Sequence, residues 1–375
     1  MKTSCPSISY TTLYGALLHR SALHKDPVVV ADIGKDLKKT WTMRPWCSGR
    51  RSTLIETDHI FHTIPINDIF RAFYERNMMR TLLLFIPIAC LSIDTVQAGS
   101  QLDSLPDAQI KTFYSEGHKD RANTISVQVA NAFNFFKDAL STEPSVTLMV
   151  LSPADWSEHS RMNVVYGMPH YADDGTLVVA AEDNPFFRSF VPPMDQLAPE
   201  MAAEIKRTYT TKDGDLTMQP FFDLLALHEL GHAFHVQADL NMQRKWLQEL
   251  YVNILLHTYI AEREPSLLPA LTLFPQMVVA GGTEGFTYTR LKDSHDHYGE
   301  LGRDHPRNYG WYQSRWHKAA ATIYDTGGMA AARKLWDALK MQKATLDDEE
   351  LLVFLRREAP EVSAMVEDWD AEVKR

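Results

Sequence analysis

The stretch LALHELGHAFH, residues 225–235, places three histidines and one glutamate in a segment that otherwise has the pattern of a buried helix. Between Phe221 and Val236 the only formally charged residues are Asp223 and Glu229, and most of the others are apolar. Burying a carboxylate and several imidazoles costs free energy unless each group has a partner. Whatever fold this chain adopts must therefore supply partners for these groups in its interior.

A metal ion is the partner that fits this spacing. His228 and His232 are four residues apart, so on a helix they project from one face with Cβ atoms ~5–6 Å apart. Two imidazoles so placed can ligate a single zinc ion at ~2.0–2.1 Å. Glu229 is rotated by ~100° from His228, which places it beside the metal, where it can take a proton from water. The alternative is a helix whose histidines and glutamate simply hydrogen-bond to neighbours.

The next predicted helix offers the third ligand. Glu249 in WLQELYVN is separated from His232 by 16 residues, and Asn253 follows four residues later on the same face. The sequence predicts one Zn²⁺ per chain in a His₂Glu site with Glu249 as ligand, and Asn253 as the group that orients a ligand imidazole. An exposed carboxylate and an exposed amide are the alternatives. Ala238 stands where a metzincin would have its third histidine, and His235 is expected to be a pocket or core residue.

Gly231, in the middle of the motif helix, is a second indication of how this helix packs. Gly231 costs ~1 kcal/mol relative to alanine at a helix interior, so its presence indicates that another segment of backbone comes close. We expect that segment to be a strand that lines the substrate site.

The pattern of elements predicts an α+β fold, because strands come early and helices late. A helix is expected over 105–141, with Val127, Val129, Ala132 and Phe136 near one face. Strands are expected at 145–152 and 175–181, the second either an edge strand for peptide docking or interior sheet. A loop with functional potential is expected at 185–200, and helices at 217–239, 244–262, 311–325 and 329–342.

HExxH followed by WLQELYVN resembles the gluzincins, the zinc metallopeptidases that include thermolysin and the M1-type aminopeptidases, over residues 145–339. The resemblance implies a thermolysin-like catalytic domain, in which a small sheet packs against a mostly helical half that carries the motif helix. It also implies a tyrosine that stabilises the oxyanion within NYGWYQSRWHKAAATIYDTGG. Tyr312 fits the spacing to Gly327 best, and Tyr309 is the second choice. The Gly-x-Met-Glu-Asn stretch of the aminopeptidases is missing, since YGMPH at 166–170 has no glutamate.

The amino-terminal region has the organisation of an exported protein. Residues 78–98 combine a short positive start, an apolar run and the small residues Val96-Gln97-Ala98, as a signal peptide does. We expect cleavage near Ala98, a mature domain over 99–375 with its core at 145–340, and no membrane span after cleavage. Residues 1–77 are then a mis-assigned start or a poorly ordered extension. Cys90 follows Pro-Ile-Ala, which is a poor lipobox, so lipid attachment there is the less favoured reading.

Together these features predict a secreted or periplasmic zinc-dependent peptidase-like hydrolase that acts on peptides or proteins. The net charge of −10 argues against a general nucleic-acid binder. Two other functions remain open: a catalytically silent zinc-binding module of the cell envelope, and a zinc hydrolase of a non-peptide amide.

Overall fold

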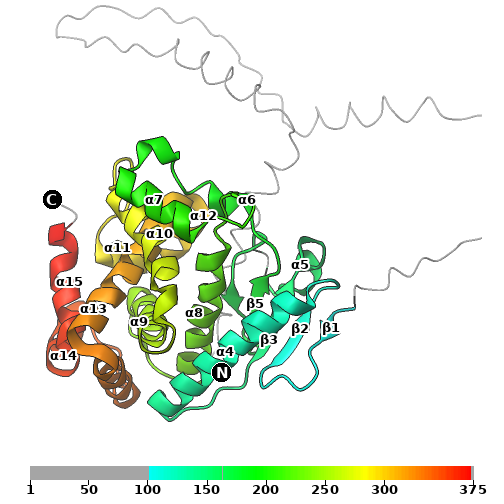
Figure 1. Cartoon of the computed structure of the whole chain (residues 1–375). Helices are drawn as coiled ribbons and strands as arrows, with labels where there is room; N and C mark the ends of the chain where they lie inside the picture. Colours follow the sequence, from blue (N-terminus) through cyan, green and yellow to red (C-terminus); the bar gives the residue numbers. More distant parts are fainter. Residues whose placement is uncertain (1–100, 163, 373–375) are drawn as a thin grey trace, which may run out of the picture. The chain divides into compact units, whose positions relative to one another are not determined.

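The chain was analysed as a computed structural model that describes residues 101–162 and 164–372 (Figure 1). The expectations for residues 1–77, for the segment 78–98 and for Cys90 lie outside the described residues. Within them the chain is an α+β fold, with a small mixed sheet beside a larger helical half. No helix in this part of the chain has both the length and the apolar character needed to cross a membrane.

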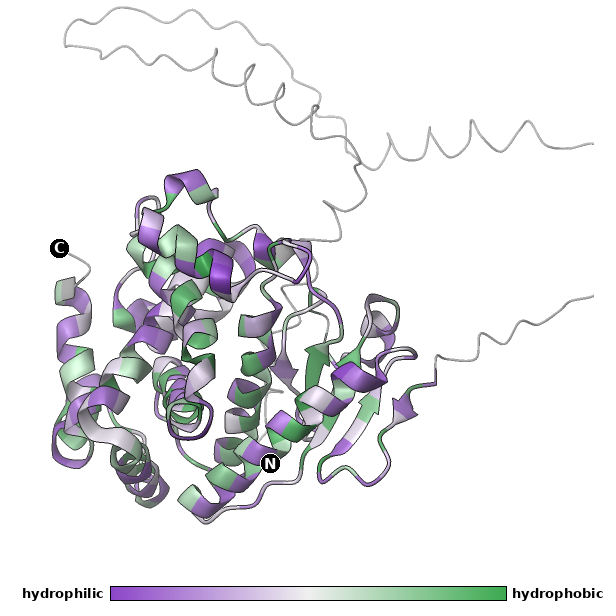
Figure 2. Cartoon of the chain, in the orientation of Figure 1, coloured by the Kyte–Doolittle hydropathy of each residue, from purple (hydrophilic) through white to green (hydrophobic). Residues whose placement is uncertain are grey.

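The sheet has five strands in the order β1-β2-β3-β5-β4, of which only β2, β3 and β5 are parallel to one another. Its strands are β1 (Asp103–Ser104), β2 (Lys111–Tyr114), β3 (Thr147–Leu151), β4 (His170–Tyr171) and β5 (Thr176–Ala180). Along β3, Leu148 and Val150 join the main core, whereas Met149 and Leu151 pack on the other face with Trp156. Along β5, Leu177 and Val179 likewise join the main core while Val178 packs on the other face, so both faces of β3 and β5 are apolar. Figure 2 shows these strands mostly in the green of hydrophobic residues.

The helices lie mainly on one side of the sheet. They are α4 (Lys119–Leu140), α5 (Pro153–His159), α6 (Pro185–Arg188), α7 (Pro199–Thr208), α8 (Gln219–Gln237), α9 (Lys245–Arg263), α10 (Leu268–Ala280), α11 (Leu291–Asp296), α12 (Tyr298–Asp304), α13 (Pro306–Met341), α14 (Asp348–Glu358) and α15 (Pro360–Glu372), with short 3₁₀ turns η3 (Met194–Gln196) and η4 (Pro265–Leu267). Helix α8 contacts the strands β4 and β5 and also α9, and α9 packs in turn against α13 (Figure 1). The HExxH helix is thus enclosed between the sheet and the helical half.

The helix predicted over 105–141 begins only at Lys119, and the segment before it contains β2. In IKTFY the residues Ile110, Thr112 and Tyr114 are buried while Lys111 is exposed, which is the two-residue period of a strand. Val127 is also wrongly placed by the prediction, since 53% of its surface is exposed. The other three residues predicted on that face, Val129, Ala132 and Phe136, are buried. Val127 lies about 200° around the axis from Val129, which turns it to the surface.

The strand β5 is interior, because it pairs with β3 on one side and with β4 on the other. The proposal that GTLVVAA forms an edge for peptide docking is therefore wrong. The edge strand next to α8 is β4, which the sequence analysis missed. Two residues without a strong apolar pattern give too little signal for a strand to be predicted.

Gly231 does meet a neighbouring segment, but that segment is a helix and not a strand. A Cβ atom at position 231 would lie 3.0 Å from Cβ and 3.1 Å from Cγ1 of Val252 in α9. The glycine therefore permits α8 and α9 to approach each other closely. These two helices carry the three predicted metal ligands, so their separation sets the dimensions of the site.

Candidate metal centre

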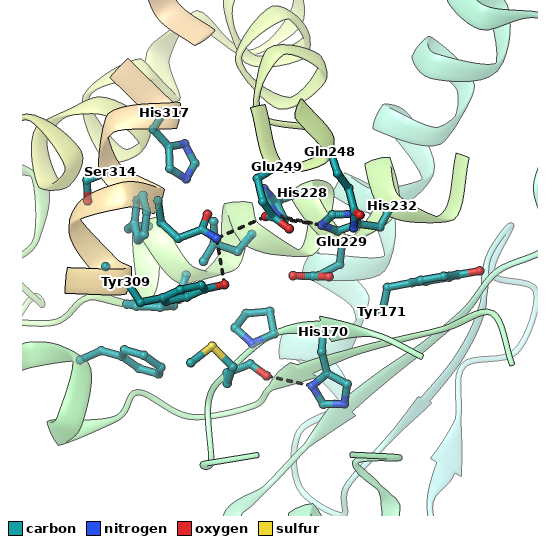
Figure 3. A pocket seen from close by; sticks show the side chains of 18 of the residues that line it. His170, Tyr171, His228, Glu229, His232, Gln248, Glu249, Tyr309, Ser314 and His317 are labelled. Carbon is teal, nitrogen blue, oxygen red and sulfur yellow. Dashed lines mark hydrogen bonds and ion pairs between the residues drawn. The ribbon is translucent and has the colours of Figure 1, made fainter. Parts of the chain in front are cut away.

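His228 and His232 lie one turn apart on α8, and both rings are buried. Their Nε2 atoms face each other at a distance of 3.1 Å (Figure 3). Two nitrogens that ligate one tetrahedral zinc ion at ~2.0–2.1 Å would lie roughly 3.3 Å apart. The spacing of the two rings is therefore that of a shared metal ion.

Glu249 completes this group from the first half of α9. Its Oε2 lies 3.4 Å from Nε2 of His228 and 3.9 Å from Nε2 of His232, and its side chain is buried. These three residues, called the triad below, are the set among the described residues whose ligand atoms converge closely enough to hold a metal ion. Burial raises the pKa of Glu249, but the hydrogen bond with His228 and the neighbouring imidazoles outweigh it and leave the pKa low. The carboxylate is thus ionised.

The outer nitrogen of each ring also has a partner. Nδ1 of His228 lies 2.9 Å from Oδ1 of Asn253, which is where the sequence predicted an orienting amide. Nδ1 of His232 lies 2.9 Å from Nε2 of His235. His235, expected only to fill a pocket or core, therefore contacts a predicted ligand directly. Each contact holds its ring with Nε2 turned toward the centre of the triad.

Two residues that the sequence analysis did not single out, Tyr298 and Gln313, contact Glu249. The hydroxyl of Tyr298 donates to Oε1 of Glu249 at 3.0 Å, and Nε2 of Gln313 donates to Oε2 at 3.3 Å. Gln313 also donates to the hydroxyl of Tyr309 at 2.9 Å, and the two tyrosine hydroxyls are 3.1 Å apart. Tyr309, Gln313 and His317 recur every four residues on α13 and all line the cavity. That spacing was visible in the sequence and could have identified this face.

Tyr312, the preferred oxyanion residue in the sequence analysis, lies outside the site. Its ring is buried between Trp316 and Trp369, and its hydroxyl donates to the backbone oxygen of Arg290 at 2.7 Å. Tyr312 lies about 60° around the axis of α13 from Tyr309, and there its ring packs into the main core. Of the two tyrosines, only Tyr309 lines the cavity.

Glu229 is partly buried beside the triad and accepts a hydrogen bond from the backbone N–H of Tyr171 in β4. Burial, together with the negative charge of Glu249, raises the pKa of Glu229 to about 8, against the opposing effects of His228 and this hydrogen bond. Figure 3 shows its carboxylate between the triad and the edge strand. A carboxyl with a pKa near neutrality can both take up and release a proton at that pH.

A cavity of about 450 Å³ opens beside the triad. Its walls come from β4, α8, α9, α10, α13 and the segment before α7. The segment 185–200, predicted as a loop, contains α6 and η3, and its Phe187 and Phe190 line the cavity. A substrate placed in this cavity would touch Glu229 and the triad together.

His317 also faces the cavity, from the fourth turn of α13. Its ring centre lies 6.3 Å from that of His228 and 5.5 Å from that of Phe221. Burial lowers the pKa of His317 to about 3, so the imidazole is neutral at physiological pH. Sequence reasoning gave this histidine no role.

Among known proteins, no family model matches this chain, and no curated protein matches it either.

The contact between His232 and His235 gives a first prediction. Replacing His235 by leucine removes the acceptor for Nδ1 of His232, so we expect zinc affinity to fall by about 10–100-fold. Replacing His235 by glutamine leaves an acceptor of similar reach, and affinity should fall less. Competition with a chromophoric chelator measures both values. Equal affinities in the wild type and the leucine variant would contradict the positioning role.

Proposed function

We propose that this chain is a zinc-dependent peptidase-like hydrolase whose mechanism is that of the gluzincins. The observation that carries the proposal is the convergence of three electron-pair donors in a buried place. Oδ1 of Asn253 only accepts, so His228 donates to it from Nδ1 and, when neutral, has its lone pair on Nε2. Burial lowers the pKa of His228, but the contact with the ionised Glu249 outweighs it and raises the pKa, so without an ion Nε2 carries a proton toward Glu249. A metal ion would take the place of that proton. A cation bound between these groups would have three ligands. Two imidazoles with one carboxylate are a ligand set that suits zinc.

When bound, zinc supplies a Lewis acid that polarises a carbonyl group and lowers the pKa of a water molecule to about 7. The residues of the chain supply the proton transfers. Glu229 takes a proton from the attacking water at its carboxylate and then delivers it to the leaving nitrogen of the scissile amide. Its backbone partner Tyr171 fixes the carboxylate on the cavity side of the triad.

The hydroxyl of Tyr309 is the group in the cavity best placed to donate to the oxygen of the reacting carbonyl. It accepts from Gln313 and lies next to Tyr298, so its position is held before a substrate arrives. A donor fixed in advance at the developing negative charge is the usual source of stabilisation in such reactions. Tyr298 and Gln313 hold Glu249 and Tyr309 in place, so they act as positioning residues.

Zinc content and peptide cleavage together test the proposal. We expect one zinc ion per purified chain by elemental analysis, and cleavage of a mixed peptide library that a chelator abolishes and added zinc restores. Cleavage of acylated amides but not of peptides would indicate the non-peptide hydrolase instead. Zinc without any hydrolysis would indicate a silent module. Sub-stoichiometric zinc would mean that His232 and His228 share a hydrogen bond and not a metal ion.

A further inference from the structure

One end of the cavity is built from phenylalanine. The rings of Phe187, Phe190, Phe221, Phe222 and Phe274, called the aromatic arm below, line it from α6, the segment after α6, α8 and α10. Phe221 lies 4.9 Å from Phe274 and 5.3 Å from Phe222 between ring centres. The rings touch one another and belong to one apolar cluster. The arm is therefore a continuous apolar wall beside the triad.

Two polar side chains face the cavity next to this wall. His317 and Ser314 are three residues apart on α13 and both line the cavity, as Figure 3 shows. His317 is 8% exposed and Ser314 is 3% exposed. Neither side chain hydrogen-bonds to any residue that the structure describes. Their polar atoms are open to the cavity and not fully buried, so a molecule that enters the cavity can pair with them.

The His317 ring has one donor and one acceptor nitrogen to satisfy. The ring of Phe221 lies next to the His317 imidazole, and it offers no hydrogen-bond acceptor in the plane of that imidazole. The remaining partner is whatever enters the cavity. A buried imidazole and hydroxyl beside aromatic rings favour a ligand that is itself aromatic and has a hydrogen-bonding group.

We propose that the aromatic arm binds the substrate side chain next to the scissile bond, and that His317 and Ser314 select an aromatic side chain with a hydroxyl, as in tyrosine. This inference rests on the proposed hydrolase function, since the zinc site places the scissile bond. The arm supplies apolar contact, and the polar pair makes one hydrogen bond that phenylalanine cannot make. A site built to bond a hydroxyl discriminates against the analogue that lacks it, because its own polar groups are then left unpaired.

A binding experiment with hydroxamates tests the selection of tyrosine side chains independently of any hydrolysis. The zinc-loaded full chain is titrated by calorimetry with N-acetyl amino-acid hydroxamates of tyrosine, phenylalanine and alanine. A second series carries the same side chains on the other side of the chelating group, so that the two series test the two sides of the scissile bond. In the series whose side chain enters the aromatic arm, we expect the phenylalanine compound to bind on the order of 10–100-fold more tightly than the alanine compound. Tyrosine should bind about five-fold more tightly again, as one net hydrogen bond provides.

The variant His317→Phe should reduce the ratio of tyrosine to phenylalanine affinity to about one, while zinc content and the preference over alanine persist. His257→Phe is the matched control, because His257 is a buried histidine on α9 that does not line the cavity. It should leave the ratio unchanged. Equal binding of tyrosine and phenylalanine by the wild type in both series, or an unchanged ratio in His317→Phe, would overturn the inference. If the selection holds but no peptide is cleaved, the proposed function fails and the binding site stands.

Discussion

Replacing Glu229 by glutamine is expected to leave zinc bound and to remove hydrolysis. The amide has nearly the shape of the carboxyl group, and Glu229 is not a member of the triad, so the metal site should stay intact. The amide cannot take a proton from water, and loss of a general base lowers turnover by about 10²–10⁴-fold. Cleavage of the peptide library and elemental analysis on the same preparation measure both quantities.

Asp173→Asn is the matched control for this variant. Asp173 is an exposed carboxylate that also lines the cavity, but it belongs neither to the triad nor to the contacts of Glu229. The same exchange of carboxylate for amide should there leave turnover within about two-fold of the wild type, because surface charges act weakly on a buried site. Undiminished turnover in Glu229→Gln would remove the proposed base.

Replacing Glu249 by alanine should have the largest effect on the metal. The variant loses the single carboxylate of the triad, and two imidazoles then hold the ion without a charged ligand. Zinc affinity should fall by more than the 10–100-fold that loss of an orienting partner causes. The increase in melting temperature that zinc gives the wild type should disappear, because this increase depends on binding to the folded state.

Glu262→Ala provides the comparison on the same helix. Glu262 is exposed near the end of α9, where it accepts a hydrogen bond from Tyr324. Zinc affinity and zinc-dependent melting should match the wild type in this variant. Circular dichroism of the metal-free proteins separates lost affinity from lost folding. If Glu249→Ala still binds one zinc ion with wild-type affinity, the carboxylate of Glu249 is not a ligand.

The triad could be predicted from the sequence because its signals are local. His228 and His232 are fixed by the geometry of one helix, and Glu249 lies on the helix that follows. The helices α8 and α9 begin and end within two residues of their predicted bounds. The two helices predicted at 311–325 and 329–342 meet within α13 at Gly328, where φ is 55° and the backbone leaves the helical conformation. Long segments of this kind show a clear periodicity of apolar residues, which makes their bounds predictable.

The surroundings of the triad could not be predicted in the same way. Tyr298 comes from the short α12 and Gln313 from α13, and the sequence does not show that these helices converge on Glu249. Tyr312 fitted the spacing of a family pattern, but its ring stacks with Trp316 and Trp369 in the core, and no local pattern shows that packing. Contacts between distant segments depend on packing and not on local pattern.

The close approach of α8 and α9 limits which substitutions the chain tolerates at positions 231 and 252. Gly231 and Val252 share a fixed volume between the helices that carry His228, His232 and Glu249. Any larger residue at 231 pushes the carboxylate away from the imidazoles unless position 252 becomes smaller. In a library randomised at both positions, zinc-binding members should therefore pair a small residue with a large one, and the two sites should vary together as one unit.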